Sequence, residues 1–108
     1  MLVGGIPNEL PAGDSIIGWG TVLTVIASYV EVATNAEKVV KVAASGLTIT
    51  LPSAVGNTAR LTYKLMVAGN LTIAAATGQT IDDGATAVLV SRYAAITLVS
   101  DNANWIII

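Results

Sequence analysis

The chain has 108 residues, a length that suits one domain of ordinary size. Hydrophobic residues make up 54% of it and charged residues only 11%, with a net charge of −2; a typical domain is about 25% charged. The chain contains no cysteine and no histidine, which excludes disulfides, thiolate chemistry, the commonest metal ligand and the commonest general base. With so little charge, part of the surface should be rich in hydroxyl groups or face another subunit.

The first twenty residues differ in composition from the rest. They hold five of the ten glycines and two of the three prolines, which favours turns and extended chain over helix. We predict an extended N-terminal arm or docking segment at residues 1–20 and a β-rich module at residues 21–108. The candidate docking residues of this arm are Ile6, Pro7, Glu9, Leu10, Pro11 and Asp14.

Two classes of partner are not expected. The five basic residues are scattered and form no stripe that could neutralise phosphates, so we expect no nucleic-acid binding. The longest apolar stretch, residues 16–30, is shorter than the roughly 20 residues of a membrane-spanning helix, and glycine and threonine interrupt it. We therefore interpret it as strand and expect no membrane insertion, and residues 1–14 show no signal-peptide pattern.

Hydrophobic residues alternate with polar ones over most of the chain. In "LTITL" the residues Leu47, Ile49 and Leu51 share one face, and "ARLTYKLMV" at residues 59–67 repeats the pattern. "YVEV" (29–32) and "VVKV" (39–42) each hold one charge between valines, which predicts an outward charge on a half-buried strand.

Turn-forming residues separate these runs. Asn and Gly tolerate the positive φ of tight hairpins. Together the runs predict about eight or nine short strands at a spacing near ten residues, and hence an all-β fold, an antiparallel sandwich or jelly-roll-like module. The predicted turns are residues 44–46, 55–58, 68–70, 76–79, 82–84 and 101–104.

Candidate catalytic groups are few. Asp82–Asp83 is the one acidic pair, and its position before Gly84 favours a turn over acid–base work or calcium binding, since no D-x-D-x-D-G loop is present. Without histidine no Ser-His-Asp triad can form, and no S-x-x-K motif exists. We expect no enzyme activity, no catalytic residue, no metal site and no cofactor.

Five aromatic residues could stack on sugars or bases. Alternation points most of them inward, and Tyr29 and Tyr63 in particular lie among core aliphatics. Trp19, in the loop sequence "GWG", is the one most expected to be exposed. The candidate ligand-binding residues in loops are Trp19, Asn57, Asp82, Asp83 and Tyr93.

The chain ends on "DNANWIII". We interpret "DNAN" as a turn and "WIII" as a strand that pairs back beside "AAITLVS" (94–100). A strand without polar alternation is buried on both faces, so one face should need cover from a neighbouring subunit. The candidate interface residues are Trp105, Ile106, Ile107 and Ile108.

Residues 28–108 resemble a β-rich module of tailed-phage virion proteins, found in tail fibres and in head-fibre or capsid decoration proteins. The resemblance lies in "LPSAVGNTAR", "QTIDDG" and "YAAITLVSDNANW". The pattern departs from the family where Ala59 and Asn102 replace glycine and where "TIDG" is lengthened to "TIDDG", a change that could form a bulge. The family pattern carries no catalytic residues.

The resemblance implies a virion structural protein, commonly trimeric, at the capsid surface or the tail. The leading hypothesis is a capsid decoration (cement) or head-fibre protein that trimerises and docks by its arm on the major capsid protein or another virion protein. The alternative is a tail-fibre or baseplate receptor-binding module that recognises a host surface glycan. A bacterial carbohydrate-binding or surface module is a third possibility.

Overall fold

The protein is described by a computed structural model, which covers residues 15–17, 20–33 and 36–108. The predicted docking residues of the arm and Trp19 lie outside these residues. The described residues form ten strands and no helix, so they contain no helix that could cross a membrane. The strands are β1 (Ser15–Ile17), β2 (Gly20–Val25), β3 (Tyr29–Val30), β4 (Glu37–Val42), β5 (Leu47–Thr50), β6 (Arg60–Leu65), β7 (Leu71–Ala74), β8 (Thr86–Leu89), β9 (Ala95–Ser100) and β10 (Trp105–Ile107).

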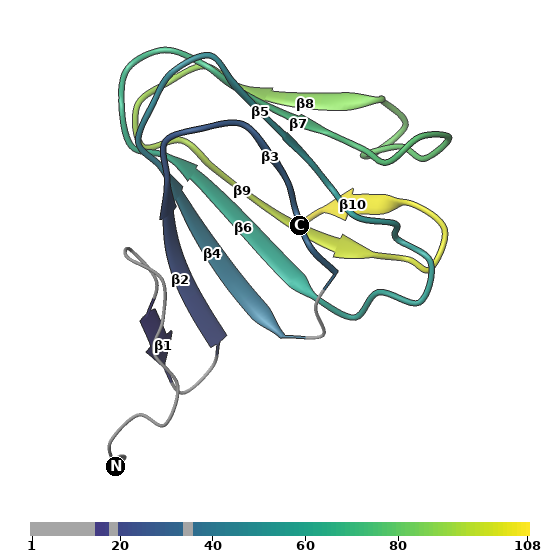
Figure 1. The fold of residues 1–108 in the computed structure, drawn as a ribbon. Helices are drawn as coiled ribbons and strands as arrows, with labels where there is room; N and C mark the ends of the chain where they lie inside the picture. Colours follow the sequence, from purple (N-terminus) through teal and green to yellow (C-terminus); the bar gives the residue numbers. More distant parts are fainter. Residues whose placement is uncertain (1–14, 18–19, 34–35) are drawn as a thin grey trace.

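The strands belong to two mixed sheets (Figure 1). The first, sheet A, has the order β1-β2-β4-β6-β9-β10, and the second, sheet B, has the order β3-β5-β7-β8. From β2 to β7 the chain alternates between the sheets, and each return adds a strand parallel to the one before: β2, β4 and β6 in sheet A and β3, β5 and β7 in sheet B. This path forms stacked turns of a solenoid, which we call coils, and each coil contributes one strand to sheet A and one strand to sheet B.

The coils end where the chain reverses. Strand β8 pairs antiparallel with β7, β9 pairs antiparallel with β6, and β10 folds back on β9. At the other edge of sheet A, β1 pairs antiparallel with β2. The prediction of an all-β fold with short strands is confirmed, but the prediction of antiparallel pairing is wrong for the central strands, which pair in parallel.

The alternation seen in the sequence sets which side chains fill the space between the sheets. Leu61, Tyr63 and Leu65 of β6 are fully buried, whereas Arg60 is exposed. Ile49 and Leu51 are buried in the same core. Each of the six predicted turns lies between strands in the structure. The predicted period-two pattern is thus confirmed for β5 and β6.

Glu31 is the exception, because the sequence predicted an outward charge and the structure buries it. Its side chain is fully buried, while Val30 and Val32 on either side are each 66% exposed. The prediction is wrong because a residue outside the motif, Lys38 of β4, also faces inward and ion-pairs with the carboxylate, its Nζ lying 2.6 Å from Oε2.

Two tyrosines complete the environment of Glu31. The hydroxyl of Tyr29 donates to Glu31 Oε1 at 2.6 Å, and the hydroxyl of Tyr63 donates to the same oxygen at 2.9 Å. Burial, followed by the negative charge of Glu31, raises the pKa of Tyr63 far above its ordinary value. Because Tyr29 belongs to sheet B and Tyr63 to sheet A, this network joins the two sheets.

The outer faces of the sheets differ in charge. On sheet A the outer face carries Lys41 beside Lys64 and the ion pair of Arg60 with Glu37, whose Nε–Oε2 distance is 3.5 Å. On sheet B the outward residues of the strands are uncharged; we call this set the valine–threonine face. It consists of Val30, Thr48, Thr50, Thr72, Ala74, Thr86 and Val88.

Candidate functional site

Three connections meet at one end of the sheets: residues 51–59 between β5 and β6, residues 75–85 between β7 and β8, and the β9–β10 turn at 101–104. In Figure 1 they lie on the side toward which β9 points. Because the parallel strands of a sheet all begin or end at the same edge, connections that are far apart in sequence are brought together here.

Polar side chains bind these connections to one another. The backbone N–H of Ala54 donates to Gln79 Oε1 at 2.9 Å, and that of Gly56 donates to Asn102 Oδ1 at 2.7 Å. Asn104 Oδ1 accepts from the N–H of Thr80 at 2.9 Å. The end of the molecule is therefore held as one unit rather than as three separate loops.

The Asp82–Asp83 pair forms a two-residue turn, as the sequence predicted. Ile81 and Gly84 are bridge partners and exchange two backbone hydrogen bonds. Asp82 and Asp83 have φ values of 52° and 87°, and two successive positive φ angles are the mark of a type I′ turn. This geometry favours Asn and Gly, so two adjacent aspartates are an uncommon choice for it.

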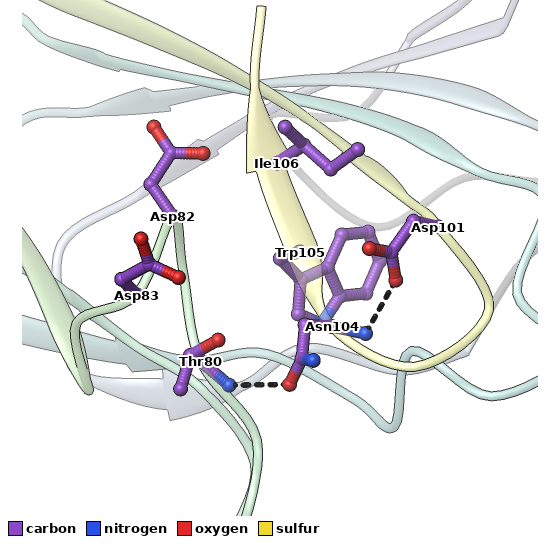
Figure 2. Close-up of a pocket in the computed structure, with 7 residues that line it drawn as sticks. All are labelled: Thr80, Asp82, Asp83, Asp101, Asn104, Trp105 and Ile106. Atoms are coloured by element: carbon purple, nitrogen blue, oxygen red, sulfur yellow. Dashed lines mark hydrogen bonds between the residues drawn. The ribbon is translucent and has the colours of Figure 1, made fainter.

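The turn and β10 border an open pocket of about 320 Å³ (Figure 2). Figure 2 shows Asp82 and Asp83 on one side of β10 and Asp101 on the other. The lining residues are Thr80, Asp82, Asp83, Asp101, Asn104, Trp105 and Ile106.

Hydrogen bonds fix part of the pocket wall. The Asp101 carboxylate accepts from the N–H groups of Asn104 at 2.7 Å and Ala103 at 2.9 Å, and these bonds lower the pKa of Asp101. Asp82 Oδ1 accepts from the N–H of Ile107 at 3.1 Å. The pocket is therefore lined by hydrogen-bond acceptors, which suit a ligand rich in hydroxyl or amide donors.

The predicted ligand residues do not all converge. Asp82 and Asp83 lie together at the pocket, but Asn57 serves its own turn, in which its Oδ1 accepts from the N–H of Ala59 at 2.8 Å. Tyr93 follows β8 and precedes β9, at the opposite end of the strands. The structure thus supports one shared site for the two aspartates and assigns Asn57 a local role.

Tyr93 lies in a second cluster, which the sequence did not reveal. Its ring is 54% exposed and its φ is 68°. The Arg92 guanidinium carbon lies 4.8 Å from the ring centroid and Lys64 Nζ lies 5.8 Å from it. Lys41 is the register partner of Lys64 on the adjacent strand. The spacing of these cations along the chain gave no sign that they meet, because only parallel pairing of β4 with β6 brings Lys41 beside Lys64.

The C-terminal strand pairs as predicted, with Trp105 opposite Ser100 and Ile107 opposite Leu98. The indole of Trp105 is buried in the chain's own core, and its Nε1–H donates to the Pro52 carbonyl at 3.1 Å. The side chains of the three residues that follow Trp105 are exposed. The exposed fractions of Ile106, Ile107 and Ile108 are 37%, 38% and 61%. We call these three residues the isoleucine strip.

In the part of the chain that the structure describes, no group of three or more Asp, Glu, His or Cys side chains is arranged to hold a metal ion. Comparisons with protein-family models, with curated proteins and with solved structures found no match to this chain.

Proposed function

We propose that this chain is a non-enzymatic structural protein of a tailed-phage virion, a capsid decoration or head-fibre protein that assembles as a homotrimer. The observation that supports it best is a pair of uncovered surfaces without charge, the apolar isoleucine strip and the valine–threonine face. The sequence resemblance of residues 28–108 supplies the virion context.

Two different surfaces are what a ring of three copies requires. In a closed ring each contact is heterologous, so every copy contributes one patch to one neighbour and a different patch to the other. The isoleucine strip lies at an edge of sheet A, and the valine–threonine face covers sheet B. Packing one against the other buries apolar side chains at roughly 25 cal/mol per Å² of surface removed from water.

Strand-to-strand addition is a weaker route to assembly at this edge. The Trp105 N–H donates to the Thr80 carbonyl at 2.8 Å, and the Asp82 N–H donates to the Trp105 carbonyl at 3.0 Å. These bonds cover the free edge of β10 at its start, as folded proteins commonly do to prevent edge pairing. Side-chain packing is therefore the favoured mode of contact.

The oligomer is tested by light scattering of the wild type and of an Ile106→Thr/Ile108→Asp variant. We expect a mass of three chains for the wild type and of one chain for the variant. Val55→Asp is the matched control, because Val55 is 64% exposed and Ile108 is 61% exposed; it should leave the mass unchanged. At about 0.1 mM protein, a contact with a Kd of about 1 μM would be formed. A wild type that is still monomeric at this concentration would refute the trimer.

The virion role is tested on phage particles. Gold-labelled antibody against the chain should mark the capsid surface in electron micrographs. Labelling confined to the tail end would contradict the decoration role and favour the alternative below.

The acceptor-lined pocket favours a second candidate function, recognition of a host surface glycan by a tail-fibre or baseplate module. Sugar hydroxyls would donate to the carboxylates that line it. A glycan array probed with the wild type and with Asp83→Gly tests this function. Glycine suits the positive φ of Asp83, so this variant removes a carboxylate without straining the turn. Binding that the variant loses supports recognition, and equal binding by both proteins rules out the pocket.

A further inference from the structure

The charges of the described residues separate into two opposite ends. Four of the ten charged residues neutralise each other as two ion pairs, Lys38 with Glu31 and Arg60 with Glu37. The remaining six divide by sign. Three cations gather at one end of the strands and three carboxylates at the other: Lys41, Lys64 and Arg92, against Asp82, Asp83 and Asp101.

The cations form what we call the basic pole, at the end toward which β4 and β6 run (Figure 1). Lys41 and Lys64 are register partners on adjacent strands, and like charges placed directly opposite each other destabilise a sheet. Arg92 and Lys64 both lie near the ring of Tyr93. This leaves two positive charges at an exposed aromatic ring and a third, on Lys41, beside Lys64.

The carboxylates form the acidic pole, at the pocket (Figure 2). Asp82 and Asp83 are adjacent and Asp101 lies across β10. All three are exposed. No basic side chain lines this pocket.

Within one chain, the two poles are too far apart for their opposite charges to attract each other. Tyr93 and Asp101 are separated by the eight residue steps of β9 and its flanks, about 25 Å at roughly 3.3 Å per residue. Charges more than about 8 Å apart are largely screened at physiological ionic strength. The like charges within each pole therefore repel one another, and no charge of opposite sign from the other pole offsets this repulsion. A surface of opposite charge on another molecule would offset it.

We propose that a second copy of this chain provides that surface, so that the basic pole of one copy docks on the acidic pole of the next along the strand direction. The two poles match in charge number, three against three, and Tyr93 offers an exposed ring that could enter the pocket mouth beside Asp83. Such a contact is heterologous and open-ended, so it extends a stack rather than closing a ring. It is independent of the lateral contact inferred above, which is apolar.

The test neutralises one pole at a time with side chains that keep the local geometry. The basic-pole variant is Lys41→Gln/Lys64→Gln/Arg92→Gln. The acidic-pole variant is Asp82→Asn/Asp83→Asn/Asp101→Asn, in which asparagine still tolerates positive φ and still accepts the turn hydrogen bonds. Glu37→Gln/Arg60→Gln is the control, since it removes two charges that already neutralise each other.

Sedimentation velocity at 50 mM and 500 mM NaCl provides the measurement. We expect the wild type and the control to form species larger than the trimer at 50 mM salt and to lose them at 500 mM. Each pole variant alone should stop at the trimer. An equal mixture of the two variants should restore a contact, because one supplies an intact basic pole and the other an intact acidic pole, but growth should end at that single junction.

The outcomes are decisive in both directions. The proposal would be overturned if either pole variant alone formed species as large as those of the wild type. It would also be overturned if the mixture formed no species larger than those of each variant alone. A contact worth about 4 kcal/mol has a Kd of about 1 mM. If the wild type shows no salt-sensitive association up to this protein concentration, the proposal is also overturned. The wild type at 500 mM salt separates the two contacts. A trimer at 500 mM that does not grow at 50 mM means that stacking has failed, whereas a single chain at 500 mM means that the trimer has failed, whatever forms at 50 mM.

Discussion

Glu31 is the residue whose burial differs most from what the sequence pattern predicted. Flanked by valines, it was expected to face outward, yet three donors bring its carboxylate inward: Lys38, Tyr29 and Tyr63. A buried charge is costly unless it is paired and hydrogen-bonded. The short-range pattern failed here because two of the three partners, Lys38 and Tyr63, lie seven and thirty-two residues away, beyond the reach of any local periodicity.

We expect Glu31→Ala to destabilise the fold by about 3–5 kcal/mol, because it removes the acceptor of the Lys38 ammonium and of the buried Tyr63 hydroxyl. Urea unfolding followed by circular dichroism measures the change. Glu37→Ala is the matched control: it breaks an ion pair whose side chains are 37% and 55% exposed, and such pairs are worth about 0–1 kcal/mol. Equal effects of the two substitutions would contradict the structural role of Glu31.

Tyr63 gives the fold a sensitivity to alkaline pH. Its pKa is raised in the native state from an ordinary value of 10.0, so above that pH the unfolded chain releases a proton that the folded chain retains. The contribution is fully present below pH 10 and falls as the pH rises, by at most about 1.4 kcal/mol per pH unit. The free energy of unfolding should therefore decline more steeply between pH 10 and 11.5 in the wild type than in Tyr63→Phe. Parallel slopes would disprove the assignment.

At the scale of elements, the C-terminal strand was predicted well. The turn at 101–104 and the pairing of residues 105–107 with β9 follow from turn chemistry and from an apolar run, both of which are local. Within one chain only one face of the strand is covered, and the prediction that a neighbouring subunit covers the other stays a prediction. Trp105 fills the core, whereas the isoleucine strip remains exposed.

Removal of residues 104–108 should abolish cooperative folding. The truncation deletes the Trp105 side chain, whose loss alone costs about 3–5 kcal/mol, and exposes the edge of β9. Differential scanning calorimetry of the truncated chain should show no unfolding peak. By contrast, Ile108→Ala should leave the melting temperature of the isolated chain within about 2 °C, since surface substitutions usually change stability by less than 0.5 kcal/mol. A truncated chain that melts like the wild type would contradict this.

At the scale of the whole molecule, strand direction was the part that the sequence could not reveal. Alternation sets which side of a strand is buried, and it is the same for parallel and antiparallel neighbours. Direction depends on which strands become neighbours, and here the chain crosses between sheets at each step, so β4 lies beside β2 and β6 rather than beside β3 and β5. The pocket and the basic pole both depend on that crossing, which is why the sequence predicted the turns at 82–84 and 101–104 but neither the pocket that they line nor the meeting of Lys41 with Lys64.

The reversal of the chain after β7 also sets the order in which the protein can be completed during synthesis. The coils from β2 to β7 can stack as they leave the ribosome, but β6 gains its second neighbour only when β9, some thirty residues later, has been made. Trp105 enters last of all. We expect refolding over milliseconds to seconds, as for other folds dominated by distant pairings, with Trp105 fluorescence in a Trp19→Phe variant changing in the final phase. A nascent chain would thus expose its unfinished sheet until β9 and β10 have been made.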